Sequence, residues 1–467
     1  MDQASLPPHV LIFPLPLQGP VNSMFKLAEL LCLSGLHVTF LLTKHTHSRL
    51  FRDTTTACHL NRYPGFRLET IPDGLPADHP RSGDRVMEIL DSLKSTSKPL
   101  FKDVLTTGRP VTCVVADGFL GFTLDVAKEM GIPVIYSRTL SACCLWIFYC
   151  LPKLIEAGEV PFQGHDLDAP VRSVPGMEPF LRRRNLPSFC RSSDLSNPFI
   201  QLCMMESQET PRAYGLIINT FEELEGSVLS NIRTLCPNLY TIGPLHAHLK
   251  TKLRTGPKAP PPTPSNSLWQ EDRSCMAWLD AQVSESVIYV SFGSLTVLSS
   301  EQLMEIWNGL VNSETRFLWV IRPDLVAGSK KWVDQVPAER GYIVSWAPQE
   351  EVLSHSAIGG FLTHSGWNST LESVYEGVPM ICCPNYADQQ VNSRFVEEVW
   401  NVGLDMKDCC DRQTVEKIVR DLMEVRKDEF ASSAEKMAKL AREAVSEGGS
   451  SYHNLVRLIK DIEAMDS

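Results

Sequence analysis

The sequence predicts a two-domain α/β protein in which each half contains a parallel sheet flanked by helices. Three observations support this fold class. Short apolar runs alternate with segments of helical periodicity along both halves of the chain. A chain of 467 residues is too long for a single hydrophobic core. A stretch at 248–267 is rich in Pro, Lys and Ser, and this composition cannot build a core.

We therefore expect a first domain at 1–247, a linker at 248–267, a second domain at 268–449, and a last helix at 450–467 that returns to the first domain. Apolar runs in the first domain predict buried strands at 9–13, 38–42, 111–116, 134–136 and 215–219, and helical patterns at 22–34 and 123–130. The second domain is predicted to have strands at 287–294, 317–321, 341–344, 358–362 and 380–383, and helices at 300–312, 370–375, 412–424 and 430–446.

Composition excludes several classes of partner. A formal net charge of −11 argues against nucleic acid and anionic membranes, because both require basic patches. The sequence has no apolar run of about 18 residues, so no membrane span is expected. Several of the 14 cysteines are adjacent pairs in apolar or helical segments, and residues 1–9 lack the basic start of a signal peptide. Reduced thiols in a cytoplasmic protein are the better interpretation.

Residues 346–389 carry the most informative pattern. The predicted strand at 358–362 ends at a His-Ser-Gly turn, and the predicted helix at 370–375 follows, with an acid in its first turn. A helix that starts after a glycine turn presents unpaired N–H groups and the positive end of its dipole, which suit a diphosphate. An ordinary βαβ unit explains the apolar runs. It does not explain the polar residues at the edge where α/β sheets bind ligands, namely His364, Asn368, Glu372, Asp388 and Gln389.

This stretch resembles the signature box of plant family-1 UDP-sugar glycosyltransferases. It has the W-x-P-Q start at Trp346, the H-x-G-W-N-S centre at His364 and the D-Q end at Asp388. The similarity extends over most of the chain and implies the GT-B fold, two Rossmann-like domains with a cleft between them. The segments 174–177 and 184–189 are similar to the branch that includes iridoid glucosyltransferases.

The resemblance implies a donor site for UDP-glucose that needs no metal. Trp346 would stack on the uracil ring, although a core tryptophan is the commoner role. The backbone of Ala347 would pair with the uracil edge, and Gln349 and Glu372 would bind the ribose hydroxyls. The other implied donor contacts, to diphosphate and sugar, are Thr139, Ser294, His364, Trp367, Asn368, Ser369, Asp388 and Gln389.

Some of these roles have simpler alternatives. Glu372 could serve only as a partner of the helix dipole, and Ser294 only as a turn residue. Gln389 goes with glucose as donor in related enzymes, while xylose, galactose and rhamnose remain open. The pair Asp166 and Asp168 is interpreted as a solvated loop rather than a metal site.

The acceptor side departs from the family pattern. The loop after the first strand usually reads Q-G-H in the plant enzymes, and its histidine is the general base. Here it reads Gln18-Gly19-Pro20, and proline cannot accept a proton. Asp117, which orients that histidine in relatives, is present. A carboxylate is a weak base, so an acidic acceptor such as a carboxylic acid, an enol, a hemiacetal or an acidic phenol would suit this chain.

Three hypotheses follow. The chain is an inverting glucosyltransferase that uses Asp117 and acts on a small, largely apolar plant metabolite, as a monomer. Alternatively, it is a catalytically impaired protein that binds a UDP-sugar or a metabolite. The third hypothesis supplies the base from His45, His47 or His79, each of which could equally be an exposed loop residue. The expected acceptor pocket, whose members could also be core residues, consists of Leu15, Leu17, Pro20, Phe119, Leu140 and Trp146.

Overall fold

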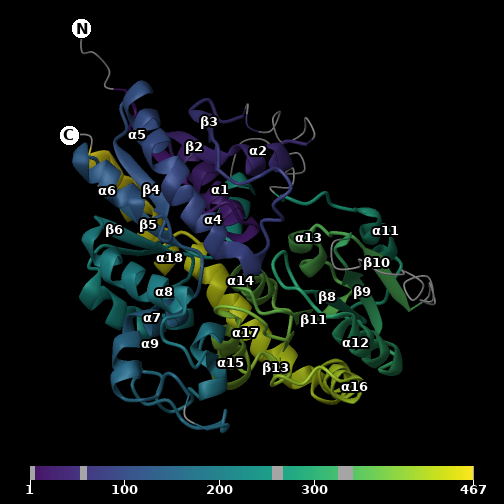
Figure 1. The fold of residues 1–467 in the computed structure, drawn as a ribbon. Helices are drawn as coiled ribbons and strands as arrows, with labels where there is room; N and C mark the ends of the chain where they lie inside the picture. The colour runs from purple at the N-terminus through teal and green to yellow at the C-terminus, as the bar shows by residue number, and fades with distance from the viewer. Residues whose placement is uncertain are drawn as a thin grey trace. The chain divides into compact units, whose positions relative to one another are not determined.

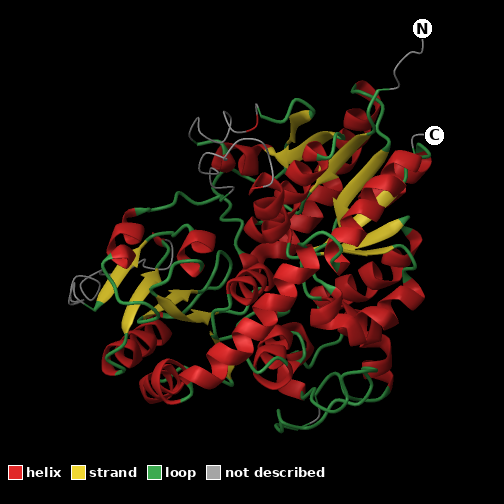
Figure 2. Cartoon of the chain, turned by 180° about the vertical axis from the view of Figure 1, so that it is seen from behind, coloured by secondary structure: helices red, strands yellow, loops and turns green. Residues whose placement is uncertain are grey.

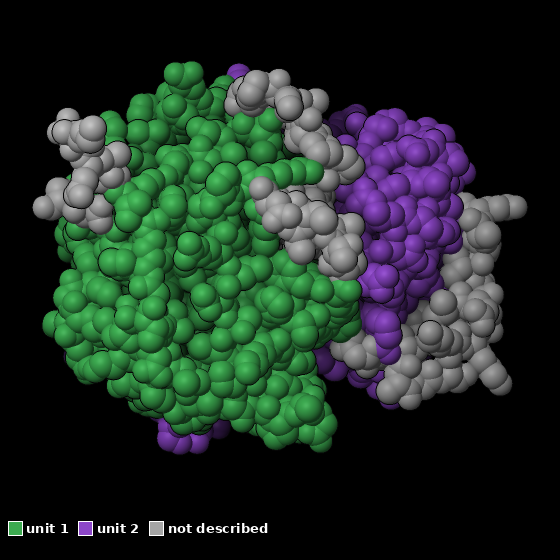
Figure 3. Space-filling view, turned by 90° about the horizontal axis from the view of Figure 1, so that it is seen from above, with its two compact units in different colours: residues 1–149, 198–269, 443–467 green, residues 150–197, 270–442 purple. Residues whose placement is uncertain are grey.

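The chain divides into two compact units (Figure 3). The first comprises residues 1–149, 198–269 and 443–467, and the second comprises 150–197 and 270–442. In this computed structural model the residues described are 6–52, 60, 62–162, 164–254, 267–323 and 340–465. The expected linker lies mostly outside them, and its first residues belong to α10 (Leu245–Arg254).

A parallel sheet of seven described strands forms the centre of the first unit, in the order β3-β2-β1-β4-β5-β6-β7. Its strands are β1 (His9–Phe13), β2 (His37–Thr43), β3 (Phe66–Ile71), β4 (Cys113–Asp117), β5 (Val134–Arg138), β6 (Gly215–Ile218) and β7 (Leu239–Thr241). Every residue of β1, β4, β5 and β6 is buried, which explains why these strands are continuous apolar runs. The strand order reverses between β1 and β4, and that edge is a switch point where open α/β sheets bind ligands.

Helices flank this sheet (Figure 2). They are α1 (Gln18–Leu33), α2 (Lys44–Leu50), α4 (Val86–Ser92), α5 (Lys98–Thr107), α6 (Phe122–Glu129), the start of α7 (Ala142–Glu156), α8 (Pro198–Glu209), α9 (Glu222–Leu235), α10 and α18 (Ser450–Ala464). The last helix lies beside the strands of this unit (Figure 1). Its Leu458 and Ile462 join the apolar core, and Tyr240 of β7 donates a 2.6 Å hydrogen bond to Asp461.

The second unit contains a parallel sheet of six described strands in the order β10-β9-β8-β11-β12-β13. Its strands are β8 (Val287–Ser291), β9 (Arg316–Val320), β10 (Gly341–Val344), β11 (Ile358–Thr363), β12 (Met380–Cys382) and β13 (Gly403–Asp405). Its helices are α11 (Ser274–Asp280), α12 (Ser300–Asn312), α13 (Gln349–Leu353), α14 (Trp367–Glu376), α15 (Gln389–Arg394), α16 (Arg412–Arg420) and most of α17 (Lys427–Val445). The strand order reverses between β8 and β11, so this sheet also has a switch point.

The structure differs from the sequence predictions at several elements. Strands β3 and β13 were not predicted, because β3 is a largely exposed edge strand with polar residues and β13 spans three residues. Helix α1 begins at Gln18 rather than at Asn22, so Pro20 lies in its first turn. Helix α14 begins at Trp367, which places Glu372 in the second turn and not in the first. Among the described residues, no helix combines the length and apolar character needed to cross a bilayer.

A close approach of two helices in the second unit gives a stability prediction. A Cβ added to Gly309 of α12 would lie 2.4 Å from the Val415 Cβ on α16. We expect Gly309→Ala to destabilise the protein by about 1–3 kcal/mol through overpacking, although alanine is the better helix former. Thermal unfolding checks this.

The control for this prediction is Gly226→Ala in α9, where an added Cβ meets nothing within 4 Å. There the change from glycine to alanine should be neutral or stabilise by about 0.5–1 kcal/mol. Equal melting temperatures for Gly309→Ala and the unmutated protein would contradict the expected clash.

Candidate active site

Polar residues of the second unit gather at the carboxyl edge of its sheet. Ser294 follows β8, His364 follows β11, and Asp388 follows β12. Strands β8 and β11 are hydrogen-bonded neighbours on either side of the switch point, with Ser291 paired to Thr363. The turns after them therefore meet at one place, where a ligand of an open α/β sheet binds.

His364 lies between two glycines. A Cβ added to Gly293 would lie 2.5 Å from the His364 Nε2, and one added to Gly366 would lie 2.4 Å from the same atom. Gly293 also has a φ of +66°, in the left-handed region that favours glycine. Burial lowers the pKa of His364 to about 4, so the imidazole is neutral at physiological pH. A neutral imidazole can donate one hydrogen bond to a ligand without carrying a charge.

Helix α14 starts directly after this turn. Gly366 is its N-cap residue and, as a glycine, makes no side-chain capping bond. A helix start of this kind, with the positive end of the helix dipole, can bind an anion. Asn368 and Ser369 occupy the second and third positions of the helix. The Trp367 ring is buried and packs against the Trp400 ring, with centroids 6.3 Å apart. Trp367 therefore presents only its backbone at the start of α14.

Gln349, at the start of α13, connects two of the predicted donor residues. Its Nε2 donates to Glu372 Oε2 at 2.6 Å and to Ser369 Oγ at 2.9 Å. Its Oε1 accepts a 3.3 Å hydrogen bond from the Tyr289 hydroxyl. Glu372 is 5% exposed, so its carboxylate is fixed in a polar cluster rather than solvated. A fixed carboxylate beside an amide is suited to binding a pair of hydroxyl groups.

Trp346 and Ala347 lie between β10 and α13. The Trp346 ring is half-buried, while Ala347 is 2% exposed. The carbonyl of Trp346 accepts a 2.8 Å hydrogen bond from the backbone N–H of Asp272, which fixes the backbone there. A partly exposed indole on a fixed backbone can stack on a planar base.

Asp388 and Gln389 belong to a turn of five residues, Asn385 to Gln389, after β12. Gln389 Oε1 accepts hydrogen bonds of 2.8 Å from the backbone N–H groups of Asn385 and Tyr386. Asp388 Oδ2 accepts a 2.8 Å bond from the Asn392 side chain, which also donates to the carbonyl of Ser365. The turn is thereby connected to the turn that carries His364.

In the first unit, most of the predicted acceptor residues follow three strands that are adjacent in the sheet. Leu15, Leu17 and Pro20 follow β1, Asp117 ends β4 and Phe119 lies just after it, and Thr139 and Leu140 follow β5. Trp146 lies further along, on α7, with its ring centroid 6.2 Å from that of Tyr149. The switch point between β1 and β4 thus brings the predicted Asp117 and the Gln18-Gly19-Pro20 segment to one edge.

Asp117 is a buried carboxyl group. Burial raises its pKa to about 6, against the opposing effects of a hydrogen bond from the Phe119 N–H and the charge of Arg138. Arg138 is 1% exposed and lies 3.8 Å from Glu206, whose own pKa is raised to about 7, chiefly by burial. Gly118 makes room for this guanidinium, since an added Cβ would lie 2.3 Å from Arg138 Cζ. Asp117 therefore changes its protonation state close to neutral pH.

Pro20 occupies the third position of α1, where the backbone N–H would have no partner within the helix. Within the described part of the chain, no imidazole hydrogen-bonds to Asp117. His45 and His47 lie on α2, and the His47 ring lies 4.8 Å from the Phe51 ring. His79 Nε2 lies 3.0 Å from Glu88, and its Nδ1 accepts from the Arg81 N–H. Each histidine is thus placed with neighbours other than Asp117.

The described residues contain no group of three or more His, Cys, Asp or Glu side chains placed to hold a metal ion. Asp168 instead forms a two-point ion pair with Arg184 at 2.7 and 2.8 Å. Asp166 accepts a 2.9 Å hydrogen bond from the Asp168 N–H.

Sequence reasoning did not identify the glycines that admit the His364 ring, nor Arg138 and Glu206. Gly293 and Gly366 can be recognised in the sequence as turn glycines. That both lie against the His364 ring becomes visible only in three dimensions. Arg138 ends an apolar strand, and a charged residue in such a run is a signal that could have been noticed.

Comparison with known proteins agrees with this geometry. The profile of the family "UDP-glucoronosyl and UDP-glucosyl transferase" matches residues 264–437. A 7-deoxyloganetic acid glucosyl transferase of Catharanthus roseus is 57% identical, over 99% of each chain. The structure of Medicago truncatula UGT71G1 complexed with UDP-glucose is 29% identical with a TM-score of 0.81, covering 99% of this chain and 100% of that one. Os79 from O. sativa in complex with UDP is 27% identical with a TM-score of 0.79, covering 97% of this chain and 100% of that one.

Three findings point to the same family. They are the two parallel sheets, the start of α14 after a glycine turn, and the 57% identity over nearly the whole chain. The chain belongs to the UDP-glucosyl transferase family, in the iridoid branch of the plant family-1 enzymes with the GT-B fold, and is a UDP-glucose-dependent glycosyltransferase.

Proposed function

We propose that this enzyme transfers glucose to an acidic small metabolite, with Asp117 acting where most relatives use a histidine. The observation that carries the proposal is Pro20 in the first turn of α1, at the same sheet edge as a buried carboxyl group that no imidazole contacts within the described residues. The relatives at 57% identity are named for 7-deoxyloganetic acid, which is itself an acid. An acceptor that loses its proton readily needs little help from a general base.

The proposed reaction is a direct displacement with inversion. An acceptor oxygen attacks the anomeric carbon of UDP-α-glucose, the bond from that carbon to the diphosphate oxygen breaks, and a β-glucoside and UDP form. The acceptor proton, where one is present, passes to Asp117 directly or through a water. Charge that develops on the leaving UDP is met by the start of α14, by neutral His364 and by Ser294, in a design that calls for no metal.

The other donor roles follow the positions of the side chains. Trp346 stacks on uracil and Ala347 pairs with its edge through the backbone. Gln349 and Glu372 bind the ribose hydroxyls, and the turn with Asp388 and Gln389 binds glucose. The first unit contributes Thr139. What supports these roles is the single polar cluster that joins Gln349, Ser369 and Glu372.

We also place the enzyme in the cytoplasm. All 13 cysteines of the described residues are free thiols, and 10 of them are buried. Reduced thiols suit a reducing compartment.

The ribose assignment gives the first functional prediction. Glu372→Ala removes a charged acceptor of two hydroxyl hydrogen bonds, each worth about 1.5–3 kcal/mol. We expect kcat/KM for UDP-glucose to fall by about 10²- to 10⁴-fold, mainly through a higher KM. Steady-state kinetics with varied UDP-glucose measure this.

The matched control is Glu376→Ala, one helical turn further along α14. It should keep the KM of the unmutated enzyme. An unchanged KM in Glu372→Ala would remove Glu372 from the donor site.

The acceptor proposal is tested with a panel of acceptors grouped by acidity, with UDP release and mass spectrometry as readouts. The unmutated enzyme should prefer acidic acceptors to neutral alcohols. Pro20→His should raise the rate on neutral alcohols by about 10²–10⁴-fold and change the rate on acids little, because a general base contributes that much. At the third position of α1 the added N–H needs no partner within the helix, so the backbone accommodates this change.

The panel also separates this proposal from its alternative. An absence of UDP release with every acceptor, together with tight UDP-glucose binding, would identify a binding protein without turnover. Equal rates of the unmutated enzyme and Pro20→His on both groups of acceptors would overturn the acidic-acceptor proposal.

The raised pKa of Asp117 predicts the pH dependence. A base must be ionised to accept a proton, and this carboxyl is ionised above its pKa of about 6. The acceptor for this test is a weakly acidic phenol that stays neutral over roughly pH 4.5–8, a range that spans the pKa of Asp117. With this acceptor, kcat/KM should fall about tenfold per pH unit below pH 6. Asp117→Asn should lower kcat/KM by about 10²–10⁴-fold and abolish this acidic limb.

Asp125→Asn, an exposed aspartate on α6, is the control and should keep both the rate and the limb. An acidic limb that persists unchanged in Asp117→Asn would assign the titration to another group.

A further inference from the structure

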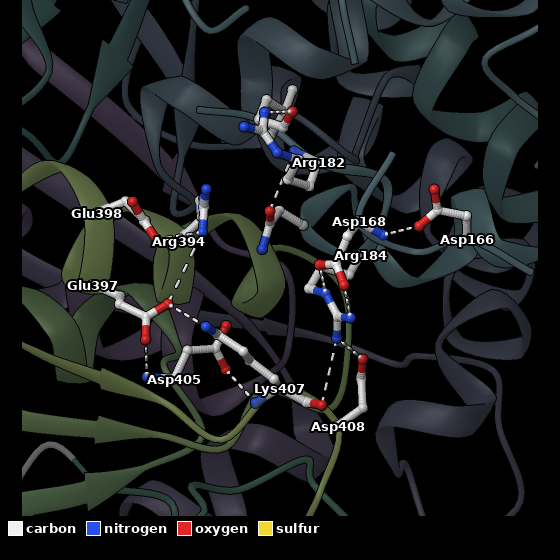
Figure 4. A network of polar contacts seen from close by, with 12 residues as sticks. Asp166, Asp168, Arg182, Arg184, Arg394, Glu397, Glu398, Asp405, Lys407 and Asp408 are labelled. Carbon is white, nitrogen blue, oxygen red and sulfur yellow. Dashed lines mark hydrogen bonds and ion pairs between the residues drawn. The ribbon is translucent and has the colours of Figure 1, made fainter. Parts of the chain in front are cut away.

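Residues 166–191 of the second unit have no role in the proposed function, and we name them the strap. The strap contacts two of the turns at the edge of the sheet in this unit. Arg184 binds Asp168 with two parallel bonds and reaches Asp408 at 3.2 Å (Figure 4). Arg191 binds the other oxygen of Asp408 at 2.9 Å. The strap is therefore fixed by charge-assisted bonds to the turn that follows β13.

The second attachment lies at the turn that follows β12. The backbone N–H of Ser188 donates to the carbonyl of Ala387 at 3.3 Å, and the N–H of Ala387 donates to Ser188 Oγ at 3.0 Å. Arg394 at the end of α15 donates a 2.8 Å bond to the carbonyl of Phe180. The turn from Asn385 to Gln389 and the helix after it are thus both held by the strap.

Ala387 has an unfavourable backbone conformation. Its φ is +56°, in the left-handed region that residues with a Cβ rarely adopt. Such a conformation persists only where the surroundings fix it, and Ser188 engages both the N–H and the carbonyl of this residue. Asp388 and Gln389 follow directly, so the direction of their side chains depends on the conformation at Ala387.

We propose that Ser188 is a positioning residue for the donor sugar: by holding Ala387 in the left-handed conformation, it orients Asp388 and Gln389 toward glucose. This inference rests on the proposed role of those two residues. It assigns the Ser188 hydroxyl a part in sugar binding although it lies on the strap and not in the signature stretch. The residues proposed for the uridine and the diphosphate lie in other turns, outside the two hydrogen bonds that join Ser188 to Ala387.

The test compares binding of UDP-glucose with binding of UDP, by calorimetry. Ser188→Ala removes one hydrogen bond to a strained turn, so UDP-glucose should bind about 3- to 10-fold more weakly. UDP, which lacks the sugar, should bind within about twofold of the unmutated affinity, a margin well below the effect of one hydrogen bond. Ser188→Thr retains the hydroxyl and should restore UDP-glucose binding.

A second variant tests the mechanism itself. Glycine adopts a positive φ without help, so Ala387→Gly introduced into Ser188→Ala should recover part of the lost UDP-glucose affinity. The matched control is Ser192→Ala, four residues further along the chain, where the hydroxyl hydrogen-bonds with the backbone of Asp194. It should leave both affinities unchanged.

The outcomes are distinct. Equal weakening of UDP and UDP-glucose in Ser188→Ala, or no change in either, would overturn the positioning role. A failure of the double variant to recover affinity would overturn the role of backbone strain. If the unmutated enzyme bound UDP-glucose no differently from UDP, the proposed contacts of Asp388 and Gln389 with glucose would fail instead.

Discussion

The neutral imidazole of His364, placed between two glycines at the switch point of the second sheet, is the constraint on which the proposed donor site depends. Only residues without a side chain at positions 293 and 366 leave room for the ring, because any Cβ there would lie within 2.5 Å of Nε2. The same two positions form the turn after β8 and the N-cap of α14. One steric requirement therefore fixes the imidazole, the turn beside Ser294 and the start of α14 together.

Much of this arrangement could be predicted from the sequence, and the reasons are local. Buried parallel strands such as β1, β4 and β8 are mainly apolar runs, with a proline after β1 and glycine turns after β4 and β8. The residues that sequence reasoning missed depend on contacts between distant positions. Ser188 lies 199 positions before Ala387, and Arg138 meets Glu206 from another element. The edge strand β3 was missed because a half-exposed strand with polar residues has no clear apolar signal.

The two units differ in how their polar groups are balanced. In the second unit, Gln349, Glu372 and Ser369 satisfy one another, which fixes them before any ligand binds. In the first unit, Arg138 faces two carboxyl groups whose pKa values are raised to about 6 and about 7, while the Nε and Nη1 of Arg138 make no hydrogen bond. The polar groups of the second unit thus satisfy one another, whereas part of the Arg138 guanidinium in the first unit makes no hydrogen bond.

The protonation state of His364 has a consequence for turnover. In the proposed role, a cationic histidine would already bind the diphosphate strongly in the ground state, and binding that is equal in the ground state and the transition state does not accelerate the chemical step. Burial instead keeps the imidazole neutral, with a pKa of about 4, so its contribution is a directed hydrogen bond. In the proposed donor role, that bond would strengthen as charge accumulates on the leaving oxygen, and so would act mainly in the transition state. Gly293 and Gly366 leave room for the ring, so in this role a substitution at either glycine would affect catalysis as well as folding.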